Sequence, residues 1–354
     1  MLDYLIVGQG IAGTSLAHFL LQREKHICVI DEETTHSSTR VAIGTCNPIT
    51  GNNFVKTWLA DSVFPFARQF YATLEHEFGE QFFYPKMLYR IFPDEKRKAK
   101  WLRKCEQPEY AGFVAESEVD EQLSRWANNP LGSIEIKQAG FVDTNKLLSK
   151  YRAHLRERQM LREQKLDFSK LRFDENQVHW HDLSARKIIF CEGSTAIANP
   201  LFMDLPISLN KGQIVTVHIP DCPIDAILKK KCIVLPWGNE IYKVGATYEA
   251  DFENLNPTDA GKEILQEQLE DLFKVPFEII EHKVGVRPAS VDRKPLIGLH
   301  HKQNMAGIFN GFGAKGLTLA PWFAQHFVAH LEEGVQLLDE VSIRNYPQRT
   351  VRNR

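Results

Sequence analysis

The sequence lacks several features that would assign it to a simple class. No apolar run reaches the roughly eighteen residues that a membrane-spanning helix requires, and the chain opens on a strand-like segment, not on a signal segment. The 43 basic and 45 acidic residues nearly cancel, so the overall charge gives no support to a nucleic-acid or membrane partner. We therefore expect a soluble, cytoplasmic protein without a membrane span.

The six cysteines form no CxxC pair and have no zinc-ligand spacing. Several stand in apolar runs, as Cys28 and Cys191 do, and we interpret them as buried reduced thiols. His326 and His330 share a helix face without a third ligand, so we predict no metal site. The sequence also lacks a nucleophile elbow, a Walker loop, internal repeats and low-complexity tracts. Its 354 residues favour two domains.

The first informative stretch is the N-terminus. Tyr4–Val7 is an apolar run, the pattern GxGxxG follows at residues 8–13, Ser15–Gln22 has helical periodicity, and the apolar run Ile27–Ile30 ends at Asp31. This order of strand, turn, helix and strand is typical of a dinucleotide site. An ordinary strand–turn–helix without a ligand is the alternative, and the motif alone does not choose between FAD and NAD. A fold that opens directly on this unit is typical of flavoproteins that keep FAD bound.

Each residue type in this unit has a physical role. Gly8 makes the tight turn, Gly10 lets the backbone approach the pyrophosphate, and Gly13 lets the helix pack closely on the strand. The phosphates lie at the positive end of the helix, and the acid after the second strand accepts the ribose hydroxyls. The predicted contacts are Gly8, Gly10, Ile11, Ala12, Gly13, Asp31 and Glu32.

Residues 41–51 are rich in small side chains. Such a segment lets the backbone approach a flat ligand, so Gly44 and Thr45 are predicted cofactor contacts, and a helix that begins near Asn52 would direct free amides at the ligand. A surface loop is the alternative. Phe54–Phe78 has helical spacing and ends at Gly79.

Three basic segments stand out on this nearly neutral chain. The first is a predicted helix over residues 93–104, the second covers residues 152–165, and the third is the C-terminal tail. A solvated helix face is the ordinary interpretation of such runs, and an anionic substrate is the other. The basic residues are Lys96, Arg97, Lys98, Lys100, Arg103 and Lys104, then Arg152, Arg156, Arg158, Arg162 and Lys165, and finally Arg344, Arg349, Arg352 and Arg354.

The middle of the chain alternates between two kinds of sheet. Residues 140–143 lead into a helix through Leu155, residues 173–190 read as strands, and the last of these is fully apolar and closes on Gly193, as in a buried parallel sheet. The dinucleotide-binding domain therefore resumes there. Residues 206–286 show repeated strand patterns crossed by one helix, over residues 258–274, which favours an antiparallel sheet.

Two further stretches stand out near the C-terminus, Val284–Pro288 and the glycine-rich Asn310–Pro321. The second of them leads into a predicted helix over residues 317–331. Together with the N-terminal unit, these stretches resemble the D-amino-acid-oxidase-like family of FAD-dependent oxidoreductases, which includes glycine and sarcosine oxidases. The resemblance extends in order through residues 44–48, 140–143, 211–213 and 245–247. Within that family, the sequence most resembles the FAD-dependent domain of the bifunctional enzyme that makes methylaminomethyl-thiouridine in tRNA, although Lys315 stands where that domain has an arginine.

The resemblance implies FAD and oxidation of a C–N bond by hydride transfer to flavin N5. No cysteine or histidine lies in a context that suggests covalent flavin attachment, so we predict noncovalent FAD. The turn before the last helix would face the N1 and C2 oxygen of the flavin, where reduction places negative charge; a plain tight turn is the alternative. Further predicted cofactor contacts are Gly193, Gly311, Gly313, Ala314, Lys315, Gly316 and Leu317.

For the substrate, the resemblance assigns Arg287 to a carboxylate, which a guanidinium binds with two parallel hydrogen bonds. A structural ion pair is the alternative. Lys315 is either a second anion contact or an exposed loop lysine. Trp237, Tyr242 and Tyr248 are candidate pocket walls or core residues, and we include Tyr242 and Tyr248 among the predicted catalytic residues with Arg287 and Lys315.

We predict an α/β protein with a Rossmann-like FAD-binding domain and an inserted α+β substrate domain built on an antiparallel sheet. The first covers residues 1–80, 140–205 and 285–354, and the second covers residues 81–139 and 206–284. The expected function is oxidation of a small amine or amino acid that bears a carboxylate. The alternatives are demodification of carboxymethylaminomethyl-uridine in tRNA, which would make tRNA a partner, and a flavin-containing binding protein without turnover. The oligomeric state stays open.

Overall fold

The computed structural model describes residues 1–117 and 121–346. The chain divides into two compact units, unit 1 with Met1–Arg40, Asn145–Asn210 and Val286–Arg354, and unit 2 with Val41–Thr144 and Lys211–Gly285. Unit 1 is therefore discontinuous, as the sequence predicts. Residues 41–80 cluster with unit 2, whereas the predicted boundary assigned them to the FAD-binding domain.

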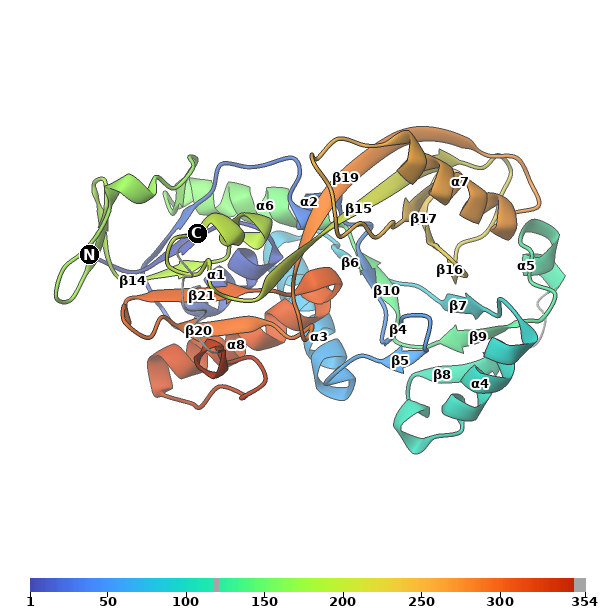
Figure 1. Cartoon of the computed structure of the whole chain (residues 1–354), viewed down its shortest axis with the longest axis horizontal. Coiled ribbons are helices and arrows are strands. Elements are labelled where there is room, and N and C mark those ends of the chain that lie inside the picture. The colour runs from blue at the N-terminus through green and yellow to red at the C-terminus, as the bar shows by residue number, and fades with distance from the viewer. Residues whose placement is uncertain (118–120, 347–354) are drawn as a thin grey trace. The chain divides into compact units, whose positions relative to one another are not determined.

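The sheet of unit 1 is mixed and is built around parallel strands (Figure 1). β1 (Leu2–Val7) lies between β2 (Ile27–Ile30) and β14 (Leu183–Phe190), and all three run parallel. β11 (Leu161–Arg162) pairs parallel with β2, and β21 (Ala306–Asn310) pairs parallel with β14. The apolar runs from which these strands were predicted are buried, which is the pattern of a parallel sheet covered on both faces.

Antiparallel strands extend this sheet. β12 (Leu171–Phe173) and β13 (Val178–Trp180) continue from β14, and β20 (Leu296–Leu299) pairs with β21. The helices of this part of the chain are α1 (Ile11–Gln22), α2 (Ser38–Val41), α6 (Thr144–Glu157) and α8 (Gly316–Glu333). The short 3-10 helices of the chain are Pro108–Tyr110, Phe168–Lys170, Gly193–Ala198, Gly313–Lys315 and Ile343–Asn345.

The larger sheet in unit 2 has eight strands in the order β19-β15-β18-β17-β16-β7-β9-β8. Its pairs are mainly antiparallel, as predicted, and the pair of β16 with β7 is parallel. The strands are β7 (Leu88–Ile91), β8 (Val114–Ser117), β9 (Ser133–Ile136), β15 (Ile207–His218), β16 (Ile227–Lys229), β17 (Ile233–Gly238), β18 (Ile241–Gly245) and β19 (Glu278–Ser290). The first residues of β15 and the last residues of β19 belong to unit 1.

Helix α7 (Asp259–Leu272) packs its apolar side against one face of this sheet. The hydrophobic cluster formed there includes Leu265 and Leu269 of the helix with Val215, Val234 and Val244 of the strands. Because successive side chains of a strand point to opposite faces, the neighbouring positions in these strands lie on the other face.

The rest of unit 2 consists of small elements. β3 (Thr45–Cys46), β10 (Gly140–Val142) and β6 (Phe83–Pro85) form a three-stranded antiparallel sheet. β4 (Ile49–Thr50) and β5 (Val55–Lys56) form a hairpin. The helices are α3 (Ala60–Phe78), α4 (Glu95–Cys105) and α5 (Glu121–Trp126).

The prediction of a helix that begins near Asn52 was wrong. Residues 49–56 form the β4–β5 hairpin, and α3 begins at Ala60. Gly51, Phe54 and Leu59 all have positive φ, a conformation that a right-handed helix does not contain. The predicted end of this helix at Gly79 is confirmed, since Gly79 caps α3 in the left-handed conformation. Among the described residues, no helix combines the length and apolar character needed to cross a membrane.

Candidate cofactor and substrate site

The predicted dinucleotide residues of unit 1 gather at one edge of its sheet. Gly8, Asp31 and Gly311 directly follow β1, β2 and β21, and Gly193 lies three residues after β14 (Figure 1). These strands are parallel, so their carboxyl ends lie at the same edge. Ligands of open α/β sheets bind in the crevice at such an edge.

The start of α1 has the features of a phosphate cradle. Gly10 is the residue before the helix, with φ −79° and no side-chain cap, and the amide of Ile11 donates to Thr39 Oγ1 over 3.2 Å. A Cβ built on Gly10 would meet only Thr39 Oγ1, at 3.3 Å, whereas a Cβ on Gly13 would lie 1.8 Å from the carbonyl oxygen of Gly8. Gly13 is therefore required for packing, and Gly10 leaves space beside amides that a phosphate can use.

The second glycine-rich turn, residues 311–316, lies beside the first, residues 8–13. A Cβ on Gly316, the first residue of α8, would lie 3.0 Å from Ile11 Cγ2 at the start of α1. Gly311 and Gly313 have positive φ, and Lys315 precedes α8 without a side-chain cap. Two helix N-termini that are three hundred residues apart in sequence thus meet in unit 1. Their dipoles favour negative charge at this place.

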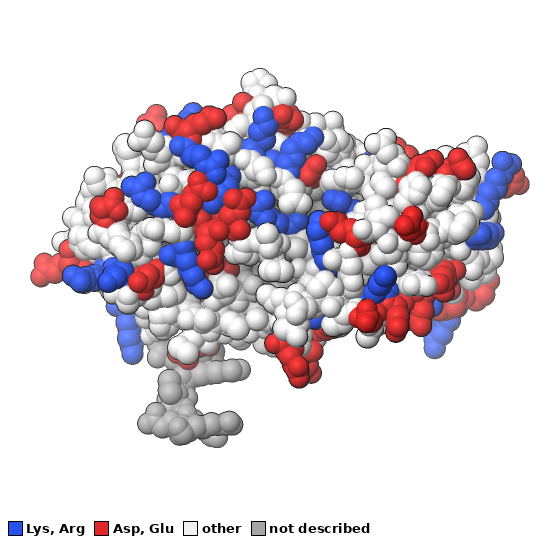
Figure 2. All heavy atoms as spheres, turned by 90° about the horizontal axis from the view of Figure 1, so that it is seen from above, with Lys and Arg blue, Asp and Glu red and all other residues white. Residues whose placement is uncertain are grey.

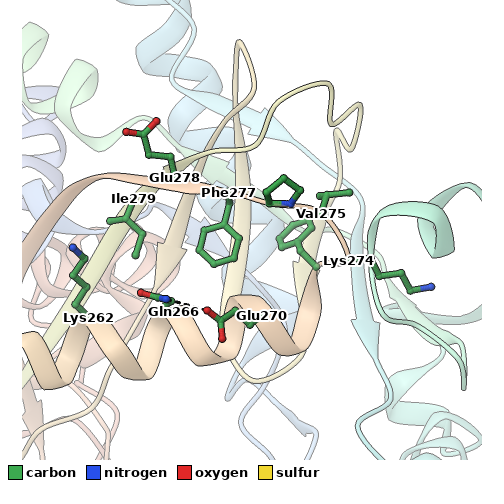
Figure 3. A pocket seen from close by; sticks show the side chains of 10 residues that line it. Lys262, Gln266, Glu270, Lys274, Val275, Phe277, Glu278 and Ile279 are labelled. Atoms are coloured by element: carbon green, nitrogen blue, oxygen red, sulfur yellow. Dashed lines mark hydrogen bonds between the residues drawn. The ribbon is translucent and has the colours of Figure 1, made fainter.

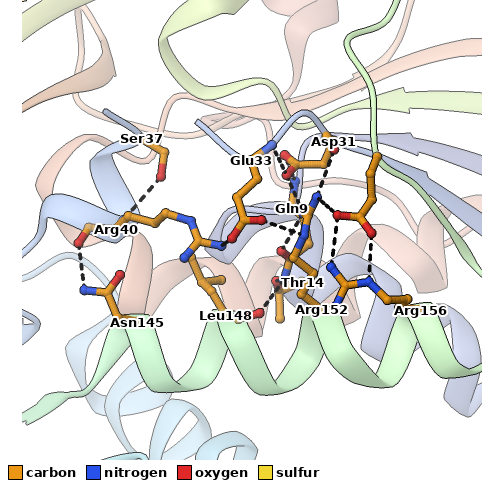
Figure 4. Close-up of polar contacts among 11 residues, drawn as sticks. Gln9, Thr14, Asp31, Glu33, Ser37, Arg40, Asn145, Leu148, Arg152 and Arg156 are labelled. Atoms are coloured by element: carbon orange, nitrogen blue, oxygen red, sulfur yellow. Dashed lines mark hydrogen bonds and ion pairs between the residues drawn. The ribbon is translucent and has the colours of Figure 1, made fainter. Parts of the chain in front are cut away.

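Asp31 is the centre of a polar network (Figure 4). Its Oδ1 accepts the amide of Gln9 over 2.8 Å, and its Oδ2 accepts Nη1 of Arg152 over 2.7 Å and the amide of Glu33 over 2.9 Å. The Arg152 side chain is only 3% exposed and also pairs with Glu33 and Glu163. Asp31 therefore holds the glycine-rich turn as well as standing at the predicted ribose position.

Sequence reasoning missed the role of Arg152 in this network, because Arg152 was grouped with a basic surface stretch. Glu163 also pairs with Arg156, and hydrogen bonds from Arg156, together with Arg152, lower the pKa of Glu163 to about 2. Glu32, a predicted cofactor contact, is exposed, and Glu33 is the neighbour that joins the network.

Glu192 is an unexpected acid beside the predicted contact Gly193. Its Oε2 accepts Asn199 Nδ2 over 2.7 Å, and burial raises the pKa of Glu192 to about 7. The carbonyl of Gly193 accepts Asn310 Nδ2 over 2.9 Å, which links the ends of β14 and β21. The Cα of Glu192 lies 3.4 Å from a Cβ built on Gly8, so a titratable carboxyl group belongs to the same edge as the first glycine-rich turn.

Arg287 lies near the second glycine-rich turn in unit 1. Its Nη1 donates to Asn210 Oδ1 over 2.8 Å. Two residues further along the same strand, Ala289 forms a bridge with Phe312, in the turn itself. Lys315 is half-buried, and burial first, then Lys294 and Arg293, lower its pKa. Arg287 and Lys315, the two cationic side chains that were predicted to bind an anion, thus belong to adjacent segments.

Gly44 and Thr45, predicted cofactor contacts, belong to unit 2. Thr45 pairs with Phe141 of β10, and a Cβ on Gly44 would lie 2.2 Å from the carbonyl oxygen of Val142. The need for glycine at position 44, where φ is +92°, therefore follows from the close approach to β10.

The predicted aromatic pocket walls do not form one group. Tyr242 packs in the hydrophobic cluster under α7, and its hydroxyl donates to the carbonyl of Cys222 over 2.8 Å, so we treat it as a core residue rather than a catalytic one. Tyr248 is 75% exposed. The ring centres of Trp237 and Phe141 lie 5.3 Å apart, and the ammonium of Lys243 lies over the Trp237 ring, 3.1 Å from its centre. Burial lowers the pKa of Lys243 to about 8.

The basic segments differ in how they are used. In α4, Arg97 pairs with Asp94, Lys100 donates to Asn53 Oδ1, and the helix carries further exposed cations. In the second segment Arg162 pairs with Asp182, as Arg152 and Arg156 do with acids. Residues 349, 352 and 354 lie outside the described residues. On the face drawn in Figure 2, acidic and basic side chains are interspersed.

A groove of about 580 Å³ lies between α7 and the segment that leads into β19 (Figure 3). Phe273, Val275 and Phe277 line it with Lys262 and Glu270. These residues all belong to unit 2 and include none of the predicted site residues. The groove is therefore separate in sequence from the glycine-rich turns.

Comparison with known proteins decides the family. The model of the family "FAD dependent oxidoreductase", DAO, matches residues 3–330 of this chain. The chain belongs to this family. Its membership explains why two glycine-rich turns, far apart in sequence, meet at one sheet edge, and the fit of the Gly10 cradle and the two helix N-termini to a dinucleotide agrees with it.

Individual relatives agree in fold. A glycine oxidase from Bacillus cereus has a TM-score of 0.80 at 21% identity, over 95% of this chain and 96% of that chain. An iminodiacetate oxidase from Chelativorans has a TM-score of 0.76 at 23% identity, over 96% of this chain and 98% of that chain.

A tRNA 5-methylaminomethyl-2-thiouridine biosynthesis bifunctional protein from Marinobacter nauticus is 23% identical over 357 residues. The match covers 91% of this chain and 54% of that protein, so this chain spans about half the length of that relative.

Proposed function

We propose that this FAD-dependent oxidoreductase oxidises the C–N bond of a small amine or amino acid that bears a carboxylate. The observation that carries the proposal is the position of Arg287, two residues before the bridge of Ala289 with Phe312 in the second glycine-rich turn. A guanidinium beside a flavin turn can hold a carboxylate through two parallel hydrogen bonds and so orient the carbon that is oxidised.

The cofactor is held noncovalently in this proposal. The two turns, residues 8–13 and 311–316, contain neither cysteine nor histidine, the side chains that commonly attach flavins. Gly10, Ile11 and Ala12 would bind the pyrophosphate through backbone amides, and Asp31 would accept a ribose hydroxyl. Gly311 and Gly316 would present the start of α8 to the ring system.

When bound, FAD would supply a hydride acceptor for the carbon next to the amine nitrogen, and water would hydrolyse the released imine. The side chains of this chain have no obligatory acid or base task in such a reaction. Arg287 fixes the orientation of the substrate, and Lys315 adds positive charge beside the turn.

Matched substrates test the role of Arg287. Sarcosine and dimethylamine differ only in the carboxylate, so the ratio of kcat/KM for the two amines measures what the carboxylate contributes. We expect this ratio to fall by about 10- to 100-fold in Arg287→Met, with FAD retained, as a lost charge-assisted pair predicts. Lys302→Met removes one exposed charge of the same unit and is the control.

An unchanged ratio in Arg287→Met would contradict carboxylate recognition by this residue. Loss of FAD in that variant would instead assign Arg287 to the framework of the turn. Arg287→Lys separates charge from geometry, since lysine keeps the charge and loses the planar pair of donors.

The second candidate is removal of the carboxymethyl group from carboxymethylaminomethyl-uridine in tRNA. It is supported by the similarity to the Marinobacter nauticus protein and by the density of exposed cations on α4. Both functions oxidise an amine that bears a carboxylate, so Arg287 would act in the same way in each.

A salt titration tests this second candidate. Replacement of Lys96, Lys98 and Lys100 by Gln should weaken tRNA binding and reduce the slope of log affinity against log salt, because each phosphate contact releases counterions. Replacement of Lys137, Lys170 and Lys302 by Gln makes the same change in net charge outside the three basic segments and is the control. Equal slopes in the two triple variants would exclude α4 as a tRNA surface.

A further inference from the structure

Two cations stand side by side in unit 2. Arg90 of β7 and Lys229 of β16 are paired residues in the parallel register of these strands (Figure 1). Directly paired positions project on the same face of a sheet. Their neighbours Ile91 and Leu228 belong to the hydrophobic cluster on the α7 side, so Arg90 and Lys229 project from the opposite face.

The guanidinium of Arg90 is buried and incompletely bonded. Arg90 is 2% exposed, and its Nη2 donates to the carbonyl of Gly51 over 3.0 Å. Its Nε and Nη1 are buried and have no hydrogen-bond partner among the residues that the structure describes. The guanidinium carbon lies 4.7 Å from the centre of the Trp101 ring, whose Nε1 is likewise buried without a partner. The unused groups at this place are all donors.

Lys229 adds a second charge. Its Nζ donates to the carbonyl of Lys231 over 2.7 Å. Burial first, and then the charge of Arg90, lower the pKa of Lys229 to about 8, and burial followed by Arg97 lowers the pKa of Arg90 to about 10. Both groups therefore carry charge at neutral pH. Within the described part of the chain, neither forms an ion pair with a carboxylate.

Arg90 is a buried cation with unused donors beside a second, partly buried cation, and such a place favours a group that accepts hydrogen bonds and does not donate them. A buried charge without a partner is costly, and an anion offsets both charges at once. A water molecule would itself need acceptors for its two hydrogens, whereas an anion needs none. Gly51 O, which accepts Nη2, has one further lone pair and could serve one of those hydrogens at most.

We propose that Arg90, Lys229 and the indole N–H of Trp101 form a binding site for a small monovalent anion, either a halide or a short carboxylate. The site lies within unit 2 and does not depend on the proposed oxidation. Its occupant serves as the counter-ion of the face that carries β7 and β16, and it keeps this part of the sheet stable.

A crystallographic experiment with bromide tests the site directly. Crystals of the holoprotein grown or soaked in sodium bromide should give an anomalous difference peak within hydrogen-bond distance of Arg90 Nη1 or Nε. Bromide sites at the protein surface show that the soak succeeded. A protein carboxylate at Arg90, or a well-defined water there both in crystals that have bromide elsewhere and in crystals soaked in sodium acetate, would overturn the proposal.

A solution experiment compares anions at equal ionic strength. In sodium bromide or sodium acetate, relative to sodium gluconate, the thermal midpoint of the holoprotein should rise and saturate by about 2 to 4 °C, since a ligand of the native state stabilises it. The bromide and acetate arms distinguish a halide site from a carboxylate site. A response to neither salt would overturn the proposal.

The variants Arg90→Met and Lys229→Met should lose the saturating response, whereas Lys96→Met, which removes an exposed charge on α4, should keep it. The readout is the response of each variant to the anion, so a change in its basal stability does not obscure the result. Two different variants also protect the test against one that fails to fold. If both respond like the unsubstituted protein, these residues do not hold the anion.

Discussion

Replacement of Gly10 by alanine separates cofactor binding from folding at the first glycine-rich turn. Gly10 has φ −79° and ψ −169°, an extended conformation that any residue adopts. A Cβ at this position would meet only Thr39 Oγ1, at 3.3 Å, and a small rotation of that side chain relieves the contact. The native fold should therefore accept Gly10→Ala with a change of less than about 1 kcal/mol in the free energy of unfolding.

The substitution should instead weaken the binding of FAD. The added methyl group stands beside the first amides of α1, where the pyrophosphate approaches the backbone. Displacing the phosphate lengthens one or two charge-assisted hydrogen bonds, each of which contributes about 1.5 to 3 kcal/mol. If about half of that energy is lost, the Kd for FAD rises by roughly 4- to 160-fold.

Titration of the apoprotein with FAD, followed by flavin fluorescence, measures this Kd, and urea unfolding measures the stability. Gly112→Ala is the matched control, because a Cβ there meets nothing within 4 Å. Gly13→Ala is the opposite control, because its Cβ would lie 1.8 Å from Gly8 O and should prevent correct folding. A Gly10→Ala protein that binds FAD with unchanged Kd would refute the assignment of this turn to the pyrophosphate.

Two further predictions concern pH, and one concerns the substrate. Burial raises the pKa of Glu192 to about 7, so the native carboxyl keeps its proton after the unfolded chain has lost it. The free energy of unfolding should therefore fall as pH rises from about 4.5 to 7. Urea titrations of Glu192→Gln should lack this fall. Burial lowers the pKa of Lys243 to about 8, so stability should rise between about pH 8 and 10.5. Lys229 contributes to the same rise, so the rise should be smaller in Lys243→Met, and an undiminished rise in that variant would contradict the prediction. For Arg287→Met, the selectivity for sarcosine over dimethylamine should collapse while the flavin spectrum persists, and full loss of flavin would contradict the substrate role.

Local periodicity explains what could be predicted from the sequence. The N-terminal strand, turn and helix, the apolar strand before Gly193, and the helix over residues 258–274 each carry their signal within a short window, and all are confirmed. The helix expected from Asn52 failed because the left-handed conformations of Phe54 and Leu59 arise from non-glycine residues, which give no sequence signal.

Long-range pairing explains most of what could not be predicted. Asp31 meets Arg152 across 121 residues of sequence, and nothing near Arg152 distinguishes it from its basic neighbours. The sequence places Tyr242 in a strand but does not say which face of the sheet α7 covers, so it could not decide between a pocket wall and a core residue. The same holds for Arg90, because burial of a charged residue depends on elements that lie far away in the sequence.

The measurement that tests the central claim most directly is anaerobic titration of the purified holoprotein, followed by its absorbance spectrum. The titrants are glycine, sarcosine, proline, several D-amino acids and undermodified tRNA. We predict a yellow protein whose flavin is bleached by a free amine that bears a carboxylate; bleaching by tRNA alone would favour the second candidate. A yellow protein that none of these titrants bleaches would contradict the proposed oxidation and favour a flavin-containing binding protein without turnover.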